Sequence, residues 1–360
     1  MTAPPARAAA RGAPGRSATE AVARVARVRR GRTRHRRLVI TVLALLVAAA
    51  YAASLMVGHT VYAPVDVLRV ILGQEVPGAS FTVGVLRLPR ASLAVLVGLC
   101  FGLGGVTFQT MLRNPLASPD IIGISSGAGA AAVFGIIVLG LDGAAVSLLA
   151  IVSGLVIAML VYLLAYRHGT AGTRLILIGI GLAAMLDSVT AYLLDRAPEW
   201  ELQEAMRWLT GSLNGADWQT ALPVLLALVT GGPALVAQTR NLAAVHLGDD
   251  AAAALGVRIE RTRVIAVVAA VGLVAFATAA TGPIAFVAFL SGPIAARIVG
   301  PRGSMLLPAA LVGALLVLVA DLGAQWALGT RFPVGVVTGV LGAPYLLYLI
   351  VRTNRTGGAL

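Results

Sequence analysis

Two carboxylates lie inside runs of otherwise apolar residues. Asp187 is near the middle of one run, and Asp321 is in the second half of another. A charge at the centre of a bilayer costs about 2.5–3.5 kcal/mol on insertion scales, so each side chain must face protein or water, or be protonated. Proton coupling is one chemistry that such acids can carry. Hydrogen bonding between helices is the alternative, and it is the one that we favour.

The sequence lacks the residues that nucleotide binding at a P-loop, Schiff-base chemistry and a metal site would require. All 28 cationic residues are arginine, so the chain has no lysine for a P-loop or for a Schiff base. The one cysteine, Cys100, lies in an apolar run and is expected to pack in a core. The four histidines are scattered and no H-E-x-x-H motif occurs, so we expect no metal site. We therefore predict a chain without cofactor or catalytic residues, and any ATP must bind another subunit.

The composition is that of a membrane protein. Of 360 residues, 58% are hydrophobic and 12% charged, and the mean hydropathy is +0.90. A spanning helix needs about 20 apolar residues, which predicts an all-α polytopic fold of about ten transmembrane helices. Gly282-Pro283 and Gly292-Pro293 interrupt the eighth, which we expect to be short or kinked. The predicted spans are 38–57, 91–111, 120–140, 144–165, 175–194, 219–237, 264–281, 283–299, 306–327 and 333–351.

Arginines are distributed unevenly along the chain. Residues 1–37 hold eleven and predict a disordered cytoplasmic tail. Residues 38–57 fit either a signal peptide or an uncleaved first span, which we favour because the basic region is long. Ten spans put both termini on one side, and cytoplasmic termini leave 22 arginines inside and six outside. Residues 353–360 would then form a second cytoplasmic tail.

The polar segment 238–263 has the pattern of a short helix on the cytoplasmic surface. Asp249 and Asp250 suit a first helical turn, and Ala251–Ala254 favours a helix. Gly256 can end it in the left-handed conformation. With Leu255 and Val257 on an apolar side, this element is suited to a partner protein.

Polar and small residues flank and fill the second span. Arg87 and Arg90, in Arg-Leu-Pro-Arg, are either interfacial anchors or cations offered to an acidic external partner. At the inner end, Gln109, Asn114 and Pro115 predict a turn within a plain membrane loop. Close helix packing is permitted by three glycines: Gly98, Gly102 and Gly105.

The ordered set of motifs resembles the FecCD family of ABC importer permeases, from about residue 38 to 352. The motifs in the first half are Arg87-Leu-Pro-Arg90, Val97-Gly98, Gln109, RNPLASP from Arg113, Ile122-Gly123 and Gly127-Ala128. Those in the second half are RWLTGSL from Arg207, LGDDAAAALG from Leu247, GPIAFV from Gly282, Leu307-Pro308, Ala320-Asp321, Pro333–Val336 and Leu341–Pro344.

The resemblance implies the type II, vitamin-B12-importer-like fold, paired with a second permease around a central path. Residues 247–256 correspond to a pair of short cytoplasmic helices in a cleft of the ATPase subunit. Arg87 and Arg90 correspond to cations that meet glutamates of an extracellular binding protein, and Gly172 and Thr173 to small residues near the inner gate. The implied ATPase-coupling residues are Leu247, Gly248, Asp249, Asp250, Ala251, Ala254, Leu255 and Gly256.

Three positions depart from the family pattern. Gln325 stands where an outer arginine is expected, and Arg331 stands where a glutamate is expected. We expect Arg331 to supply the docking cation that Gln325 lacks. The inner loop reads SGPIAAR over 291–297, so its contacts are not implied by the resemblance.

The resemblance implies a permease subunit of an iron(III)–siderophore importer in the bacterial plasma membrane. Its implied partners are a second permease, identical or not, two ATP-binding subunits, an extracellular binding protein and the lipid bilayer, with no nucleic acid. Haem or vitamin B12 is the alternative cargo. Two further hypotheses are a proton-coupled secondary transporter that uses Asp187 or Asp321, and an export or assembly component without a transport path.

Overall fold

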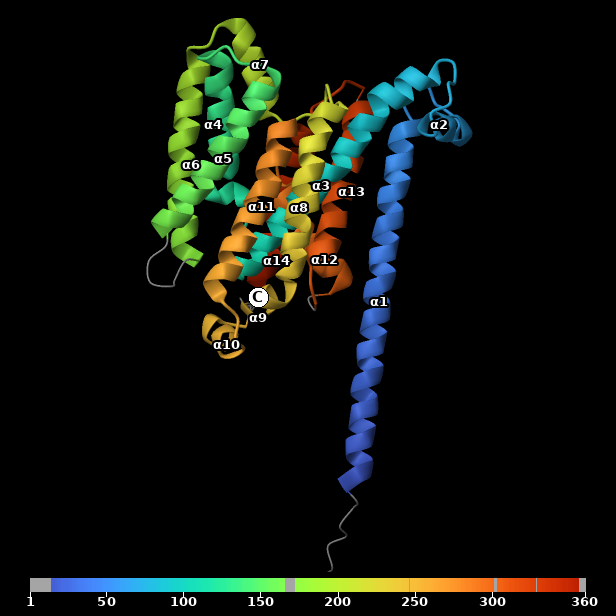
Figure 1. Ribbon diagram of the computed structural model, residues 1–360, viewed down its shortest axis with the longest axis vertical. Helices are drawn as coiled ribbons and strands as arrows, with labels where there is room; N and C mark the ends of the chain where they lie inside the picture. The colour runs from blue at the N-terminus through green and yellow to red at the C-terminus, as the bar shows by residue number, and fades with distance from the viewer. Residues whose placement is uncertain (1–13, 166–171, 246, 301–302, 328, 356–360) are drawn as a thin grey trace, which may run out of the picture.

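The computed structural model describes residues 14–165, 172–245, 247–300, 303–327 and 329–355, and its regular elements in these ranges are all helical (Figure 1). They are α1 (Pro14–Met56), α2 (Pro64–Ile71), the π-helical η1 (Ser80–Arg87), α3 (Leu88–Leu112), the 3₁₀ turn η2 (Pro119–Ile122), α4 (Ile124–Ile137), α5 (Gly143–Ala165), α6 (Gly172–Asp195), α7 (Glu199–Leu209), α8 (Trp218–Ala237), α9 (Thr239–Val245), α10 (Asp249–Ala254), α11 (Ile259–Thr281), α12 (Val287–Val299), α13 (Leu306–Trp326) and α14 (Val334–Arg355).

The expected set of ten apolar helices is present. Among the described residues, seven helices are long and apolar enough to cross a membrane, and three shorter apolar helices accompany them: Ile124–Ile137, Val287–Val299 and Val334–Leu349. Each of the ten overlaps one predicted span. The all-α polytopic fold is therefore confirmed, and apolar length alone was enough to predict it.

The eighth span is short, as its glycine–proline pairs predicted. Gly282 and Phe286 adopt positive φ values of 70° and 64°, so the chain turns twice before α12 begins at Val287. Thirteen helical residues rise only about 20 Å, less than the roughly 30 Å hydrocarbon core. Irregular backbone at membrane depth must be covered by protein, and Ile284 and Val287 of this stretch are buried.

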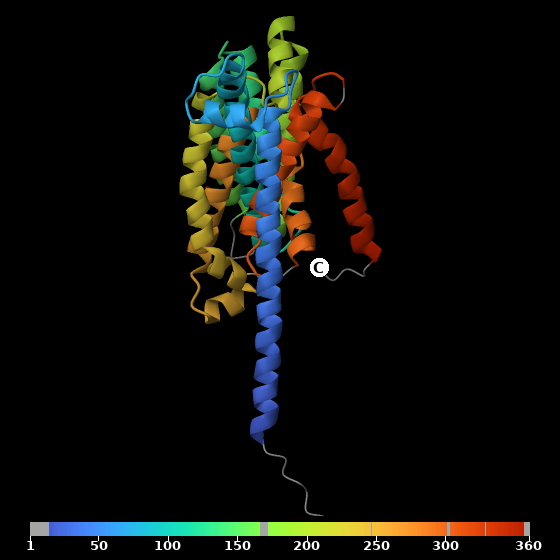
Figure 2. The same cartoon turned by 90° about the vertical axis from the view of Figure 1, so that its right-hand side faces the viewer.

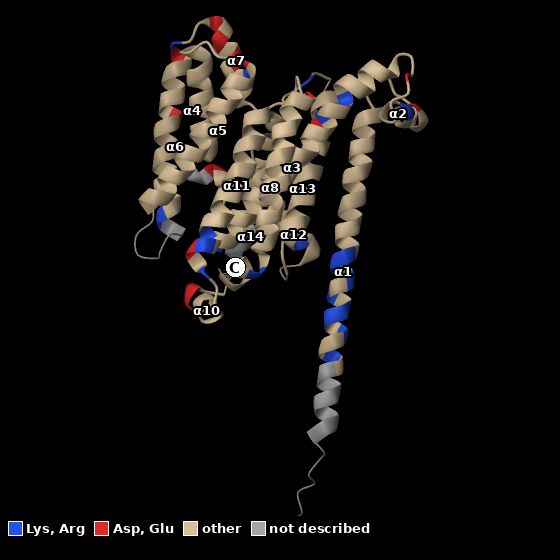
Figure 3. Cartoon of the chain, in the orientation of Figure 1, with Lys and Arg blue, Asp and Glu red and all other residues tan. Residues whose placement is uncertain are grey.

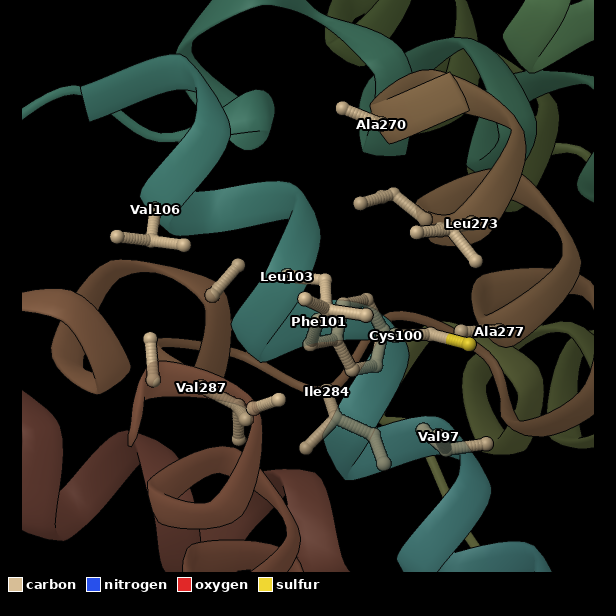
Figure 4. Packing of buried hydrophobic residues seen from close by; sticks show 14 of the residues in the cluster. Val97, Cys100, Phe101, Leu103, Val106, Ala270, Leu273, Ala277, Ile284 and Val287 are labelled. Carbon is tan, nitrogen blue, oxygen red and sulfur yellow. The ribbon is translucent and has the colours of Figure 1, made fainter. Parts of the chain in front are cut away.

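Helix α3 lies at the centre of the bundle and packs against α8, α11, α12 and α13. The three predicted contact glycines are confirmed. A Cβ at Gly98 or Gly102 would collide with the α13 backbone at Ala314 or Ala309, and one at Gly105 with the carbonyl oxygen of Ala288. Figure 4 shows the buried apolar side chains of this core, and Cys100 is buried among them, which fits its expected structural role.

Helices α4, α5 and α6 form a second group beside this centre, with α7 at one end (Figure 1). A separate buried cluster, which includes Val133, Val146 and Ala205, holds α4, α5 and α7 together. The group is joined to the centre where α5 packs on α11. Glu199 and Glu201 occupy the first turn of α7, where they suit the helix dipole.

The prediction of a disordered tail over 1–37 needs correction from Pro14 onward. Helix α1 begins there and runs without a break into the first span, about 65 Å in all (Figure 2). Alanine and arginine are strong helix formers, and extending an existing helix needs no new nucleus. Residues 1–13 lie outside the described part of the chain. Leu43 and Leu55 of α1 are buried, and Tyr51 bonds Ser92 of α3 at 2.9 Å, which favours the first-span interpretation.

Candidate functional site

Two short helices, α9 and α10, project from one end of the bundle (Figure 1). Asp249 and Asp250 lie in the first turn of α10, as predicted. Gly256 follows with a φ of +79°. Its N–H donates to Ala253 O at 2.9 Å, and that of Val257 donates to Ala252 O at 3.0 Å. This pair of bonds is the Schellman arrangement, so the predicted left-handed cap is confirmed.

The position of the helix pair differs from the expectation that 247–256 contains both helices. That segment contains α10 alone, and its companion α9 precedes it at Thr239–Val245. Leu247 and Leu255, at the two ends of α10, are 71% and 67% exposed. Ala252 is buried, and Ala251 and Ala254 are exposed. Two exposed leucines beside small residues provide an apolar surface suited to a protein partner.

An ionic cluster fastens α10 to the spans. Arg263 of α11 donates to both carboxylate oxygens of Asp249, at 3.0 and 2.8 Å. Arg113, which ends α3 with a left-handed φ of 51°, donates to Asp249 Oδ1 at 3.0 Å. It also donates to Val245 O at 3.1 and 2.6 Å. Neither arginine is identifiable from the sequence as a partner of Asp249, because Arg113 is 136 positions away and Arg263 lies on another helix.

At the opposite end, Arg87 caps the first span. Its guanidinium donates to Leu55 O and Met56 O at 2.9 and 3.0 Å, and to Thr60 O at 2.8 Å. It also lies 5.1 Å from the ring centroid of Tyr62. The last carbonyls of a helix lack partners within it, and a cation satisfies them well. Docking through Arg87 stays a prediction, and it would compete with these bonds.

Arg90 and Asp321 form a bidentate ion pair between α3 and α13. Nε and Nη2 of Arg90 donate to the two carboxylate oxygens at 3.0 and 2.8 Å. The side chain of Asp321 is only 4% exposed, and that of Arg90 is 20% exposed. Gln325 adds a bond to Asp321 at 2.7 Å, and Asn214 accepts from Arg90 at 2.8 Å. For Asp321, the hydrogen-bonding interpretation therefore holds.

Arg331 belongs to a small cluster with His59 and Trp326. Its Nη2 donates to His59 Nε2 at 2.9 Å, and its guanidinium lies 5.6 Å from the ring centroid of Trp326. The rings of His59 and Trp326 meet edge to face at 4.9 Å. Because these contacts leave Arg331 exposed, its predicted docking role fits the geometry and stays a prediction.

The chain forms a turn at the C-terminal end of α3, as Asn114 and Pro115 predicted. Asn114 N donates to Gln109 O at 3.1 Å, and Asn114 Oδ1 accepts from Leu116 N at 2.9 Å. The Gln109 side chain donates to Phe289 O of α12 at 3.0 Å. Pro293 has no N–H for that carbonyl, so Gln109 replaces a missing helical bond.

Asp187 differs from Asp321. It is exposed on α6, and among the described residues no side chain bonds it. The expected helix-to-helix hydrogen bond of this carboxylate is therefore not found in the part of the chain that the structure describes. Gly172 and Thr173, the candidate gate residues, begin α6, and their side chains lie outside the described part of the structure.

Asp120 is a polar residue that the sequence analysis overlooked. It lies in η2 and accepts from Ser118 Oγ at 3.0 Å and from Ser125 Oγ. The Ser-Pro-Asp sequence at 118–120 was a usable signal, because serine before proline is a common helix start. Within the described residues there is no group of three or more side chains that could hold a metal.

In the described part of the chain, ten apolar helices packed around the buried spans α3 and α13 define a polytopic membrane protein. It belongs to the FecCD transport family, whose model matches residues 38–352. The chain is 40% identical to the ferric enterobactin transport system permease protein of Escherichia coli over 326 residues, which are 89% of this chain and 98% of that one. It is 39% identical to the achromobactin transport system permease protein of Dickeya dadantii, over 88% of this chain and 92% of that one.

A cobalamin import system permease of Halobacterium salinarum is 35% identical over 76% of this chain and 74% of its own length. Among solved structures, an inward-facing metal-chelate type ABC transporter matches with a TM-score of 0.79 and 26% identity. The match covers 88% of this chain and 99% of that one.

Proposed function

We propose that this chain is the membrane permease of an ABC importer for an iron(III)–siderophore complex. The observation that carries the proposal is α10, a short capped helix that extends beyond the bundle with Leu247 and Leu255 exposed. A soluble subunit can hold such an element without entering the membrane. The chain has no lysine for a P-loop, so that subunit is the ATPase.

The orientation follows from the arginines. Helix α10 and the arginine-rich part of α1 lie at the same end of the molecule (Figure 3). By the positive-inside rule this end faces the cytoplasm. The opposite end carries Arg87, Arg90 and the acids of α7, and faces the extracellular binding protein. Both termini are then cytoplasmic.

Asp187 supports a second permease subunit. Its carboxylate is exposed near the middle of α6, where contact with lipid is costly. A partner permease, identical or not, would cover this face of α6 and leave Asp187 beside a hydrated central path. The complete importer is then two permeases, two ATPases and one binding protein.

The mechanism is a change of access driven by ATP in the partner subunits. Closure of the ATPases displaces α10, and the permeases switch between outward-facing and inward-facing states. Gly172 and Thr173, at the start of α6, are the residues that we propose for the inner gate. The chain itself performs no bond chemistry on the cargo.

The cargo is proposed from the relatives' names. Two relatives at 39–40% identity are named for ferric enterobactin and achromobactin transport. The cobalamin relative matches a smaller part of this chain, so vitamin B12 is the second candidate. The choice of cargo rests chiefly with the binding protein.

The test is uptake into proteoliposomes that contain the permease with its copurified ATPase and binding protein. Radioactive ferric enterobactin and cobalamin are compared, with and without internal ATP. Uptake of the ferric chelate that needs ATP, the ATPase and the binding protein is the expected result. Uptake by the permease alone that collapses with a protonophore, and is lost in Asp187→Asn, would instead establish a proton-coupled transporter.

A further inference from the structure

A single carboxylate joins α10 to the inner ends of two central spans. Asp249 bonds Arg113 at the end of α3 and Arg263 in the second turn of α11. Arg113 also donates to the last residue of α9, Val245. The two arginines therefore hold both short helices against the bundle through one acid and one carbonyl.

The other residues of α10 provide few groups for polar contacts with the spans. Its other residues are Asp250 and four alanines, which have no polar side-chain group. Asp250 is exposed, and no bond of its side chain occurs among the described residues. Ala252 is the buried contact. Asp249 thus makes the polar attachment of α10 to the spans.

The two attached spans reach through the centre of the molecule. Helix α3 has 25 residues, a rise of about 37 Å. Its far end carries Arg90, paired with Asp321 of α13. Between these ends, Gly98 and Gly102 bring α3 into backbone contact with α13. Closely packed interiors transmit displacement instead of absorbing it, so a shift of Arg113 reaches the outer end of the bundle.

We propose that Asp249 is the positioning residue that makes α3 and α11 follow α10 when the ATPase moves. The inference rests on the proposed importer function. The side chains of Arg113, Asp249 and Arg263 are 41%, 37% and 18% exposed, and partly exposed ion pairs add little to stability. We infer that these ion pairs transmit movement, because Asp249 binds arginines from two separate helices.

The experiment measures the ATP hydrolysed per ferric enterobactin imported by the complete complex in proteoliposomes. Arg263→Gln removes the bidentate partner of Asp249, and Asp249→Asn removes its charge. Each is expected to raise the ratio at least about fivefold, the lower end of coupling between linked sites. Asp249→Glu keeps the charge and should recover part of the loss. The matched control is Arg261→Gln on the same helix, because Arg261 is exposed and no bond of its side chain occurs among the described residues.

Two results would overturn the inference. One is a normal ratio in both Arg263→Gln and Asp249→Asn. The other is an equal rise in Arg261→Gln, which would assign the effect to net charge. The double variant Asp249→Asn/Arg263→Gln should match Asp249→Asn alone, because that change already removes the partner of Arg263, and additivity would also contradict a shared link. If Asp249→Asn does not assemble, Arg263→Gln and Arg113→Gln decide the matter. A wild-type complex without ATP-driven uptake would instead refute the importer function.

Discussion

Gln109 of α3 donates a hydrogen bond to the carbonyl oxygen of Phe289 in α12, at 3.0 Å. That carbonyl precedes Pro293 by four residues, so the helix cannot satisfy it. The neighbouring Gly292 has no side chain, and a Cβ there would collide with Gln109 Oε1. A proline inside a short membrane helix is thus accommodated by a side chain from the central span.

Gln109→Met should destabilise the protein, because it removes the donor while keeping the volume. An unsatisfied buried carbonyl costs about 1–3 kcal/mol. The midpoint of thermal unfolding of the purified permease in detergent measures the effect. Thr110→Val is the control, because Thr110 bonds Val106 within its own helix. An equal fall of the thermal midpoint in both variants would show that the hydrogen bond from Gln109 to Phe289 O is not what stabilises the protein.

Gly102→Ala should weaken the contact between α3 and α13. The added methyl group meets the carbonyl of Ala309, and overpacking of this kind costs about 1–3 kcal/mol. Gly272→Ala in α11 is the matched change, because nothing lies within 4 Å of a Cβ there. It should be neutral or stabilising, since alanine favours a helix by about 1 kcal/mol. Thermal midpoints of the two variants should therefore move apart.

Removing one partner of the Arg90–Asp321 pair should harm the protein more than removing both. Asp321→Leu leaves Arg90 without its carboxylate partner. Breaking such a buried pair costs about 3–5 kcal/mol, with the smaller value expected because Arg90 is partly exposed. The double variant Arg90→Met/Asp321→Leu should recover part of the thermal midpoint. If the single and double variants are equally unstable, the unpaired charge of Arg90 is not the cause of the lost stability.

Asp217 should make the stability of the N-terminal end of α8 depend on pH. It caps that helix by accepting from Thr220 N and Oγ1 at 2.7 and 2.6 Å, and these bonds lower its pKa below the ordinary value of 3.8. A lowered folded-state pKa gives stability that is present above about 3.8 and is lost as the pH falls below it.

Asp217→Ala should therefore cost about 1 kcal/mol near pH 7. Amide hydrogen exchange in the first turn of α8 measures this difference. The gap between wild type and variant should narrow below pH 4, and a gap that stays constant with pH would contradict the assignment.

Ala254→Arg should uncouple ATP hydrolysis from uptake while leaving the spans folded. Ala254 is exposed at the end of α10, so the larger side chain fits this chain and obstructs only a docked partner. Retention of the ATPase during affinity purification should fall, with the thermal midpoint of the permease unchanged. Normal retention and normal transport would remove α10 from its proposed role.

Some departures from the sequence-based predictions have a clear physical cause. The helix α7 and the early start of α1 at Pro14 were missed because their polar surfaces do not resemble membrane spans. Arg87 looked like a free cation because nothing in its own motif reveals the carbonyls of Leu55 and Met56 that it caps. Asp187 and Asp321 both lie within apolar runs of the sequence. Their surroundings differ because Asp321 is on α13, which packs against the central helix α3, whereas Asp187 is on the peripheral helix α6.

The sequence by itself determined the ten apolar helices and the cap of α10. Span length follows from the thickness of the membrane, and the turn at Gly256 follows from local backbone freedom. Only the tertiary structure decided the partners of the polar side chains. Asp249 meets Arg113 across 136 positions, Gln109 meets Phe289 across 180, and Arg90 meets Asp321 across 231. Such pairs depend on how helices pack against one another, and neither periodicity nor spacing within one helix contains that information.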